Sequence, residues 1–189
     1  MGPRLRGDDP LMVPATQPVR SAYFWGPLTR LGLATALAAA AADQAAKLWL
    51  LFVFDIEARQ RAAVTPFLDL VLVWNKGISY GLFQQEGLVG QWALLALKVV
   101  AVVLLWAWLA RCGARLTAVS LGLIIGGALG NAIDRLAHGA VADFVLLHLS
   151  TATWSFNWYV FNLADVAIVA GVAGLLYDSL LGERAAKAP

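Results

Sequence analysis

Four long apolar stretches limit the folds open to this chain more than any other feature. They cover roughly residues 31–54, 88–110, 117–136 and 159–181. An α-helix needs about 20 mostly apolar residues to cross the hydrocarbon core of a bilayer. The 189 residues are 60% hydrophobic and only 14% charged, whereas soluble domains are about 45–50% apolar. The sequence therefore predicts an integral membrane protein with four transmembrane helices in one domain.

The positions of the basic residues predict the orientation of these helices. Loops rich in Lys and Arg stay on the cytoplasmic side of a membrane. Basic residues precede the first stretch, separate the second from the third, and follow the fourth: Arg4, Arg6, Arg20, Arg30, Arg111, Arg115, Arg184 and Lys187. With four spans, all three groups fall on one side. We therefore expect both termini in the cytoplasm.

The two ends of the chain lie outside the predicted transmembrane domain, which covers residues 27–184. Residues 1–26 hold four of the seven prolines and no apolar run. Such a segment buries too little apolar surface to fold alone. We expect residues 1–26 to be a disordered cytoplasmic tail and residues 185–189 to be a second, short cytoplasmic tail.

The segment between the first two helices, near residues 55–87, predicts a small β-sheet on the outer surface. Its residues Phe67–Trp74 are rich in strand formers, and Asn75–Gly77 favours a turn. Tryptophan prefers the boundary between lipid and water. Five tryptophans near the predicted outer boundary are therefore interpreted as interface anchors: Trp49, Trp74, Trp92, Trp154 and Trp158.

Several polar residues lie inside the predicted helices. Asp43 and Lys47 are four residues apart in the first helix, so they share a face and can pair. In the third helix Asn131, Asp134 and Arg135 share a face at its outer end, and Arg135 or other neighbours can hold Asp134 ionised. Taken alone, this cluster is structural as often as it is a site. Small residues at four-residue spacing in the same helix favour close helix packing: Gly122, Gly126 and Gly130.

Asp143 and Asp165 lie at the edges of apolar segments, where an ionised side chain is costly unless it has a role. Asp143 follows the third helix on a short outer segment, and Asp165 lies in the first turns of the fourth helix beside Asn162. Two carboxylates that meet in a low-dielectric pocket share a proton, so that one acts as base and the other as acid. Such a pair can activate water to attack an amide. The spacing leaves open that each acid is satisfied by local hydrogen bonds.

Other kinds of chemistry have weaker support in the sequence. No Gly-x-Ser-x-Gly or His-Glu-x-x-His pattern is present. Cys112, the single cysteine, lies in a loop on the predicted cytoplasmic side and is interpreted as incidental. His138 and His148 flank Asp143, but His138 serves equally well as a loop residue. We expect no metal and no cofactor. We also expect no nucleic-acid partner, because the basic residues are scattered.

Two other classes of membrane protein are considered. A small proton-coupled transporter also uses membrane-embedded Asp, Arg and Lys as a relay. The chain has no internal repeat and no paired broken helices, which disfavours this alternative. A non-enzymatic membrane scaffold is the third hypothesis, and it predicts that both aspartates tolerate alanine.

Five motifs, taken in order, resemble those of the bacterial lipoprotein signal peptidases, also called type II signal peptidases. The resemblance covers about residues 31–181. The motifs are Asp43–Lys47, Asn75–Phe83, Gly130–Arg135, Val141–Phe144 and Phe161–Asp165. Each motif alone is weak, whereas their common order is specific.

The resemblance implies an all-α membrane protein with four transmembrane helices and a small extracytoplasmic β-sheet domain. It implies an intramembrane aspartyl endopeptidase that cleaves diacylated prolipoproteins just before the lipidated cysteine, with Asp143 and Asp165 as the catalytic pair. The residues implied to bind substrate or support the site are Asn75, Gly77, Asn131, Asp134, Arg135, Asn162, Asp43 and Lys47.

The same resemblance carries expectations about partners and location. The protein is expected in the bacterial cytoplasmic (inner) membrane as a multi-pass monomer, in contact with membrane lipid and with its active site toward the outer leaflet. Inhibition by globomycin-like peptides is also implied.

Overall fold

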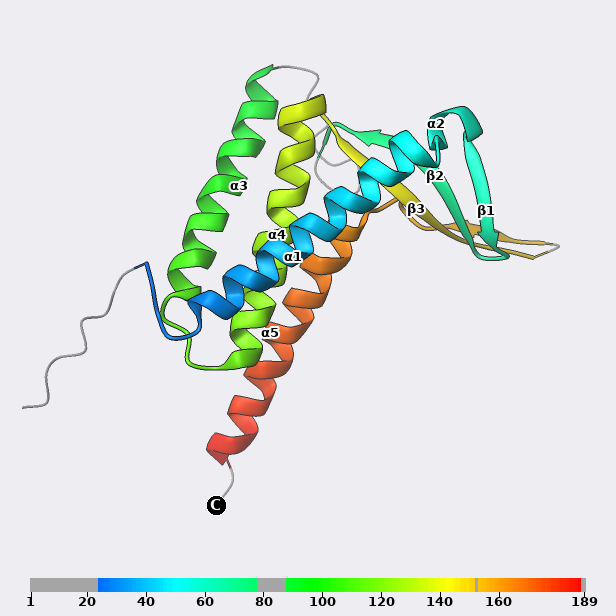
Figure 1. The fold of residues 1–189 in the computed structure, drawn as a ribbon. Helices are drawn as coiled ribbons and strands as arrows, with labels where there is room; N and C mark the ends of the chain where they lie inside the picture. Colours follow the sequence, from blue (N-terminus) through cyan, green and yellow to red (C-terminus); the bar gives the residue numbers. More distant parts are fainter. Residues whose placement is uncertain (1–23, 78–87, 152, 188–189) are drawn as a thin grey trace, which may run out of the picture.

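The structure is a computed structural model that describes residues 24–77, 88–151 and 153–187. The tail predicted for residues 1–26 falls mostly outside this part of the chain, as do positions 78–83 of the second motif. Four long helices run alongside one another, and a small sheet extends from one end of the group (Figure 1).

The long helices match the four apolar stretches. They are α1 (Thr29–Leu48), which continues into the π-helical turn η1 (Trp49–Val53), α3 (Leu88–Leu109), α4 (Arg115–His138) and α5 (Leu163–Lys187), and a short α2 (Ile56–Arg59) follows η1. Among the described residues, three segments are long and apolar enough to cross a membrane: Thr29–Val53, Arg115–His138 and Leu163–Leu180. The structure thus has the helices expected of a membrane protein.

Helix α4 is the centre of the bundle, with contacts to α1, α3 and α5. Its glycines make these contacts close. A Cβ atom added at Gly126 would lie 2.8 Å from the Ala39 Cβ of α1, and one at Gly127 would lie 2.8 Å from Ile168 of α5. Real Cβ atoms do not approach so closely, so only glycine fits there. The close helix packing predicted from the glycine spacing is confirmed.

The sheet has four antiparallel strands in the order β1 (Arg61–Thr65), β2 (Leu68–Asn75), β3 (Val141–Ser150) and β4 (Ser155–Asn157). Strand β2 confirms the strand predicted at Phe67–Trp74. The prediction was wrong in confining the sheet to residues 55–87, because two of its strands come from the segment after α4. Strand β3, with ten residues, pairs with β2, and this partner lies about 70 residues earlier in the chain.

A small apolar core joins the sheet to the end of the first helix. It contains Leu50, Ile56, Ala142 and Phe144, all buried. Because Ala142 and Phe144 flank Asp143 on β3, this core also fixes the backbone on both sides of that aspartate. Gly139, with a φ of +72°, ends α4 in the left-handed conformation and turns the chain into β3.

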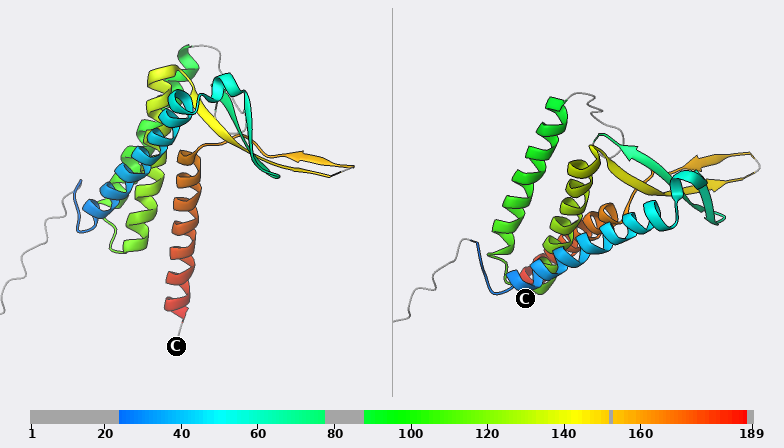
Figure 2. Two further views of the ribbon diagram at one scale, coloured as in Figure 1. Left: turned by 45° about the vertical axis from the view of Figure 1, so that its right-hand side comes forward. Right: turned by 45° about the horizontal axis from the view of Figure 1, so that its top comes forward.

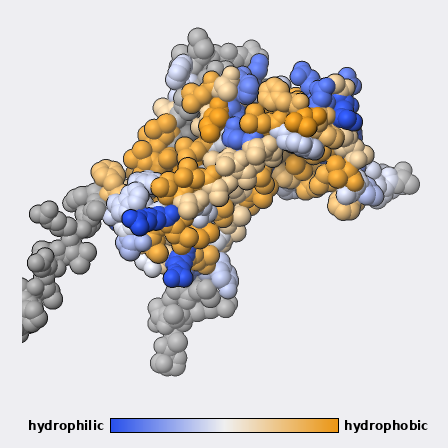
Figure 3. Space-filling view, in the orientation of Figure 1, coloured by the Kyte–Doolittle hydropathy of each residue, from blue (hydrophilic) through white to orange (hydrophobic). Residues whose placement is uncertain are grey.

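The outer surfaces of the helices are apolar. Leu97 of α3 and Val169 and Leu176 of α5 are each more than 60% exposed. In a space-filling view, hydrophobic residues dominate the helical part of the molecule, and hydrophilic residues gather at the upper edge of the sheet (Figure 3). This distribution suits helices surrounded by lipid.

Candidate active site

The polar residues singled out in the sequence meet where α1, the end of α4, the start of α5 and strand β3 come together. Asp143 is the third residue of β3 and is 3% exposed, and Asp165 is the third residue of α5. Asn131 and Asn162, which the sequence placed on different segments, are buried between them. The structure therefore gathers on one site residues that are spread over more than 100 positions.

Asp143 is held by two amide side chains. Asn162 Nδ2 donates to its Oδ1 at 2.7 Å, and Asn75 Nδ2 donates to its Oδ2 at 3.1 Å. Burial raises the pKa of Asp143 to about 6, and the nearby charge of Asp165 acts in the same direction, whereas the two amide hydrogen bonds oppose the rise. Asp143 therefore keeps its proton to a higher pH than an ordinary aspartate, with half-protonation at a pH of about 6.

Asp165 is held by the N-terminus of its own helix. Its backbone N–H donates to Asn162 Oδ1 at 3.0 Å, and its Oδ2 accepts from the Asn162 backbone N–H at 3.2 Å. These reciprocal bonds form a capping box in which Asn162 is the N-cap. Asn131 Nδ2 donates to the remaining carboxylate oxygen at 3.0 Å. The Asp165 carboxylate thus lies at the positive end of the helix dipole and accepts from two N–H groups.

Asn162 connects the two aspartates directly. Its side-chain amide donates to Asp143 while its carbonyl oxygen accepts from the backbone of Asp165. The same amide nitrogen lies 3.0 Å from Asn131 Oδ1. Because one asparagine contacts both acids, their relative position depends on a single buried side chain.

A second layer of charged residues holds the backbone next to each aspartate. Asp43 of α1 accepts from the N–H of Ala164 at 2.9 Å, and Asp134 of α4 accepts from the N–H of Ala142 at 3.1 Å. Ala164 and Ala142 immediately precede Asp165 and Asp143. Each acid of the second layer therefore fixes the main chain at one acid of the first.

Lys47 joins the two acids of this second layer. Its ammonium lies 2.8 Å from Asp43 Oδ2 and 2.7 Å from Asp134 Oδ2, and it also donates to Asn131 Oδ1 at 3.2 Å. All three charged side chains are almost fully buried. The pairing of Asp43 with Lys47 predicted from their spacing is confirmed. We call Asp43, Lys47 and Asp134 the buried clamp.

Sequence reasoning missed two contributions to this clamp. Gln44 was not among the predicted site residues, yet its Nε2 donates to Asp134 Oδ1 at 2.9 Å and to the Gly130 carbonyl at 3.1 Å. A polar residue inside an apolar stretch was the available signal. The second contribution, from the main-chain N–H groups of Ala142 and Ala164, leaves no signal in side-chain identity.

The sequence left open whether Arg135 or another neighbour holds Asp134, and the structure decides between them. Asp134 pairs with Lys47 on the neighbouring helix, whereas Arg135 Nη2 donates to the carbonyl of Gly77. The N–H of Gly77 in turn donates to Asn75 Oδ1 at 3.0 Å. Successive helical residues point about 100° apart, so Asp134 and Arg135 reach different neighbours. Arg135 thus secures the chain that follows β2, next to the asparagine that holds Asp143.

The remaining candidates lie away from the two aspartates. His148 Nε2 contacts Asp69 Oδ2 at 3.1 Å on the sheet, and the ring of His138 packs against Trp74. Cys112 is buried at the opposite end of the bundle, in a core that includes Leu109 and Leu121.

Comparison with known proteins gives matches over most of the chain. A family model described as Signal peptidase (SPase) II matches residues 35–181. The chain is 64% identical to the lipoprotein signal peptidase of Nitrobacter hamburgensis and 59% identical to that of Rhodopseudomonas palustris, in both cases over 85% of this chain and 98% of the relative. A bacterial membrane enzyme solved at 2.3 Å resolution has a TM-score of 0.68 at 22% identity, covering 84% of this chain and 92% of its own.

The solved structure shares the fold of this chain, and the two relatives share its sequence over 85% of its length. These matches confirm the resemblance drawn from the five motifs, including the class of enzyme, and give no support to a transporter. The protein is a peptidase. With a family model matched over residues 35–181 and curated relatives around 60% identical, the chain belongs to the signal peptidase II family of lipoprotein signal peptidases.

Proposed function

We propose that Asp143 and Asp165 are the catalytic pair of this peptidase, which removes the signal peptide of diacylated prolipoproteins before the lipidated cysteine. The observation that supports this most is that Asn162 donates to both carboxylates, from its side-chain amide to Asp143 Oδ1 and from its backbone N–H to Asp165 Oδ2. Two acids satisfied separately by local bonds would need no common partner. No other acids among the described residues share an asparagine in this way.

The environments of the two acids suggest different roles. Asp165, at the helix N-terminus, is the base that takes a proton from water as the oxygen attacks the scissile carbonyl. Asp143, whose pKa is raised by burial, gives its proton to the carbonyl oxygen. When the tetrahedral intermediate collapses, the C–N bond breaks and the proton held by Asp165 passes to the amine of the lipidated cysteine. Asp143 recovers its own proton as the carbonyl of the signal peptide reforms.

Neighbouring groups provide donors for the substrate. Within the described residues, Arg135 Nη1 is buried and has no hydrogen-bond partner. Buried donors are seldom left unpaired. We assign Arg135 Nη1 to a backbone carbonyl of the bound peptide. The other guanidinium nitrogen, Nη2, holds Gly77, which in turn donates to Asn75.

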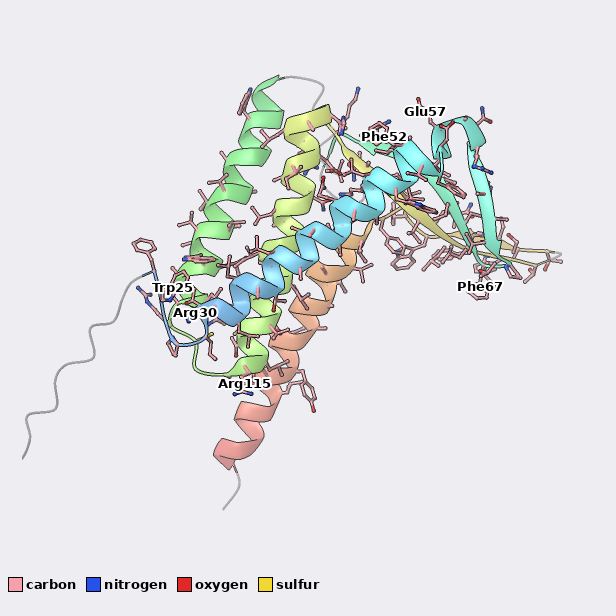
Figure 4. The ribbon with its side chains drawn as sticks, viewed as in Figure 1. Trp25, Arg30, Phe52, Glu57, Phe67 and Arg115 are labelled. Carbon is pink, nitrogen blue, oxygen red and sulfur yellow. The ribbon has the colours of Figure 1, made fainter. Side chains whose placement is uncertain are left out.

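The proposed orientation in the membrane follows the charges. Arg30 and Arg115 lie at the end of the bundle opposite the sheet, next to the ends of α1 and α4 (Figure 4). The sheet end carries Glu57, Arg59 and Arg61 in and beside α2. Basic residues favour the cytoplasmic side. We therefore place the sheet and the two aspartates at the outer leaflet. In this proposal α3 crosses the membrane in addition to the three segments named above, and both termini lie in the cytoplasm. The acyl chains of the substrate can then stay in lipid, and a globomycin-like peptide would compete for the same site.

The test is cleavage of a synthetic diacylated prolipoprotein by the purified protein in detergent. We expect Asp143→Asn and Asp165→Asn each to lower turnover by about a hundredfold to ten-thousandfold, the range for loss of a general acid or base. Asp178→Asn is the matched control, since Asp178 lies on the same helix as Asp165 but accepts from Thr117 at the far end. Wild-type turnover in either site variant would overturn the assignment.

A further inference from the structure

Strands β3 and β4 form a hairpin whose two faces differ in chemistry. Leu149 pairs with Phe156, and residues directly opposite one another in an antiparallel pair share a face. Alternation along each strand adds their second neighbours to that face. We call this the aromatic face of the hairpin, and it comprises Leu147, Leu149, Trp154, Phe156 and Trp158.

The aromatic face is an ordered row of exposed rings. Trp154 and Phe156 stack with centroids 5.8 Å apart, and Phe156 meets Trp158 edge to face at 5.9 Å. Trp154 is 54% exposed and Phe156 44%. The described parts of the chain thus leave about half of each of these rings uncovered. A contiguous apolar row of this kind marks a contact with a partner or a membrane.

The opposite face of the same hairpin is polar. The register pairs His148 with Asn157 and Ser150 with Ser155, so these four side chains lie together. Next to them, His148 contacts the buried Asp69, which also pairs with Arg61. One face therefore suits water and the other an apolar medium.

The hairpin is continuous with a membrane-spanning helix. Trp158, at its base, precedes the first residue of α5 by only five positions, and Leu163 and Val166 carry the exposed apolar surface on into that helix. The hairpin projects sideways from the bundle, across the direction of α5 rather than along it (Figure 2). Phe67, which is 55% exposed, lies at the lower edge of the sheet in Figure 4. Helix α5 extends downward from the sheet in the same view.

We infer that the β3–β4 hairpin is a membrane-surface arm, with its aromatic face inserted into the lipid interface beside the bundle. Tryptophan and phenylalanine suit this boundary, and a face of five apolar side chains opposed by polar ones is the strand equivalent of an amphipathic interfacial helix. The lipid surface is chosen over a protein partner because the aromatic face continues the apolar surface of α5.

The arm gives β3 a second function. Asp143 lies near the start of this strand and Leu149 near its end, six residues or roughly 20 Å away at the usual rise of a strand. If the far end of the strand rests on the bilayer, the depth of Asp143 relative to the lipid headgroups is set at two points. The acyl chains of a lipidated substrate are anchored to the same surface, so the arm would place the site at the level of the scissile bond.

The test compares two neighbouring positions in strand β4. In a Cys112→Ala background, which removes the single native thiol, Phe156→Cys and Asn157→Cys are each labelled with a nitroxide. Labelled proteins are reconstituted into phosphatidylcholine vesicles, and collision rates with oxygen and with a water-soluble nickel chelate are measured by power saturation. Oxygen concentrates in lipid and the chelate in water. We expect the ratio of oxygen to chelate collisions to be several-fold higher at position 156 than at position 157.

Two results would overturn the inference. Equal, high access of the chelate at both positions would mean that the arm stands in water. Low access of both reagents at position 156 would mean that a protein surface covers the aromatic face. Cleavage of substrate in detergent checks that each labelled protein is folded. Because the collision measurement is independent of turnover, its failure would leave the assignment of the catalytic pair untouched.

Discussion

At the scale of single residues, Asn162 has two tasks. It caps α5 by accepting from the backbone of Asp165, and it donates to Asp143. Its amide has one acceptor oxygen and one donor nitrogen, so it can contact the Asp143 carboxylate and the Asp165 backbone at once only with a fixed orientation. Aspartate in its place would lose the donor to Asp143 and add a charge. The residue type follows from this double contact.

Asn75 gives a prediction about pH. Its hydrogen bond lowers the pKa of Asp143 against the larger effect of burial, so Asn75→Ala should raise that pKa further above about 6. In the proposed mechanism Asp143 acts in its protonated form, so activity should fall as pH rises through this pKa. The alkaline limb of the kcat/KM profile should move to higher pH by roughly one unit, the equivalent of about 1.4 kcal/mol of lost hydrogen bonding.

The control for this measurement is Asn157→Ala, which removes an exposed asparagine from the polar side of β4. It should leave the limb where it is. The alkaline limb could also stay in place in Asn75→Ala, with substrate cleavage shown to be rate-limiting. That result would mean that a group other than Asp143 causes the limb.

At the scale of elements, the contact of α1 with α4 decides how closely the buried clamp can form. Gly122, Gly126 and Gly130 all face α1. A Cβ atom at Gly130 would lie 2.6 Å from Asp43 Oδ2. The absence of a side chain there is what lets the carboxylate of one helix reach the other helix and Lys47.

Gly130→Ala should therefore displace Asp43 as well as separate the helices. We expect a loss of about 1–3 kcal/mol in stability, typical of overpacking, together with lower turnover because Ala164 loses its acceptor. The thermal midpoint in detergent and the rate of substrate cleavage measure the two effects. Gly113→Ala is the matched control, since nothing lies within 4 Å of a Cβ atom at that position. Equal behaviour of the two variants would contradict the packing argument.

At the scale of the whole molecule, Lys47 links four elements through two carboxylates. Asp43 of α1 and Asp134 of α4 both pair with its ammonium. Asp43 also accepts from the backbone of α5 through Oδ1, and Asp134 accepts from the backbone of β3 through Oδ2. Buried charges are costly without partners. Lys47 therefore stabilises the relative placement of the segments that carry Asp143 and Asp165, although its own ion pairs are with Asp43 and Asp134.

Lys47→Met should leave two buried carboxylates without their cation. We expect a loss of about 3–5 kcal/mol in stability, measured as a fall of the thermal midpoint in detergent. Adding Asp43→Asn should restore part of the loss, because it removes one of the two charges and keeps an oxygen for the Ala164 N–H. Arg30→Met, an exposed charge on the same helix, should have little effect. Additive losses in the double variant would show that Lys47 and Asp43 do not act as a unit.

Much of the site was accessible from sequence because local spacing places residues on helix faces. The pair of Asp43 and Lys47 and the grouping of Asn162 with Asp165 both follow from three- and four-residue spacing. The alternative in which Asp143 and Asp165 are satisfied separately could not be dismissed from spacing. Whether they share a partner depends on how β3 lies against the start of α5.

The sequence by itself determined the membrane class, the four long helices and the small residues of α4, because hydropathy and helical period are local properties of the chain. Only the tertiary structure decided that residues 141–157 complete the sheet, that Asp134 pairs with Lys47 instead of Arg135, and that Gln44 joins them. It also decided which main-chain N–H groups meet Asp43 and Asp134. Strand register and helix crossing set these contacts, and both depend on partners distant in the chain.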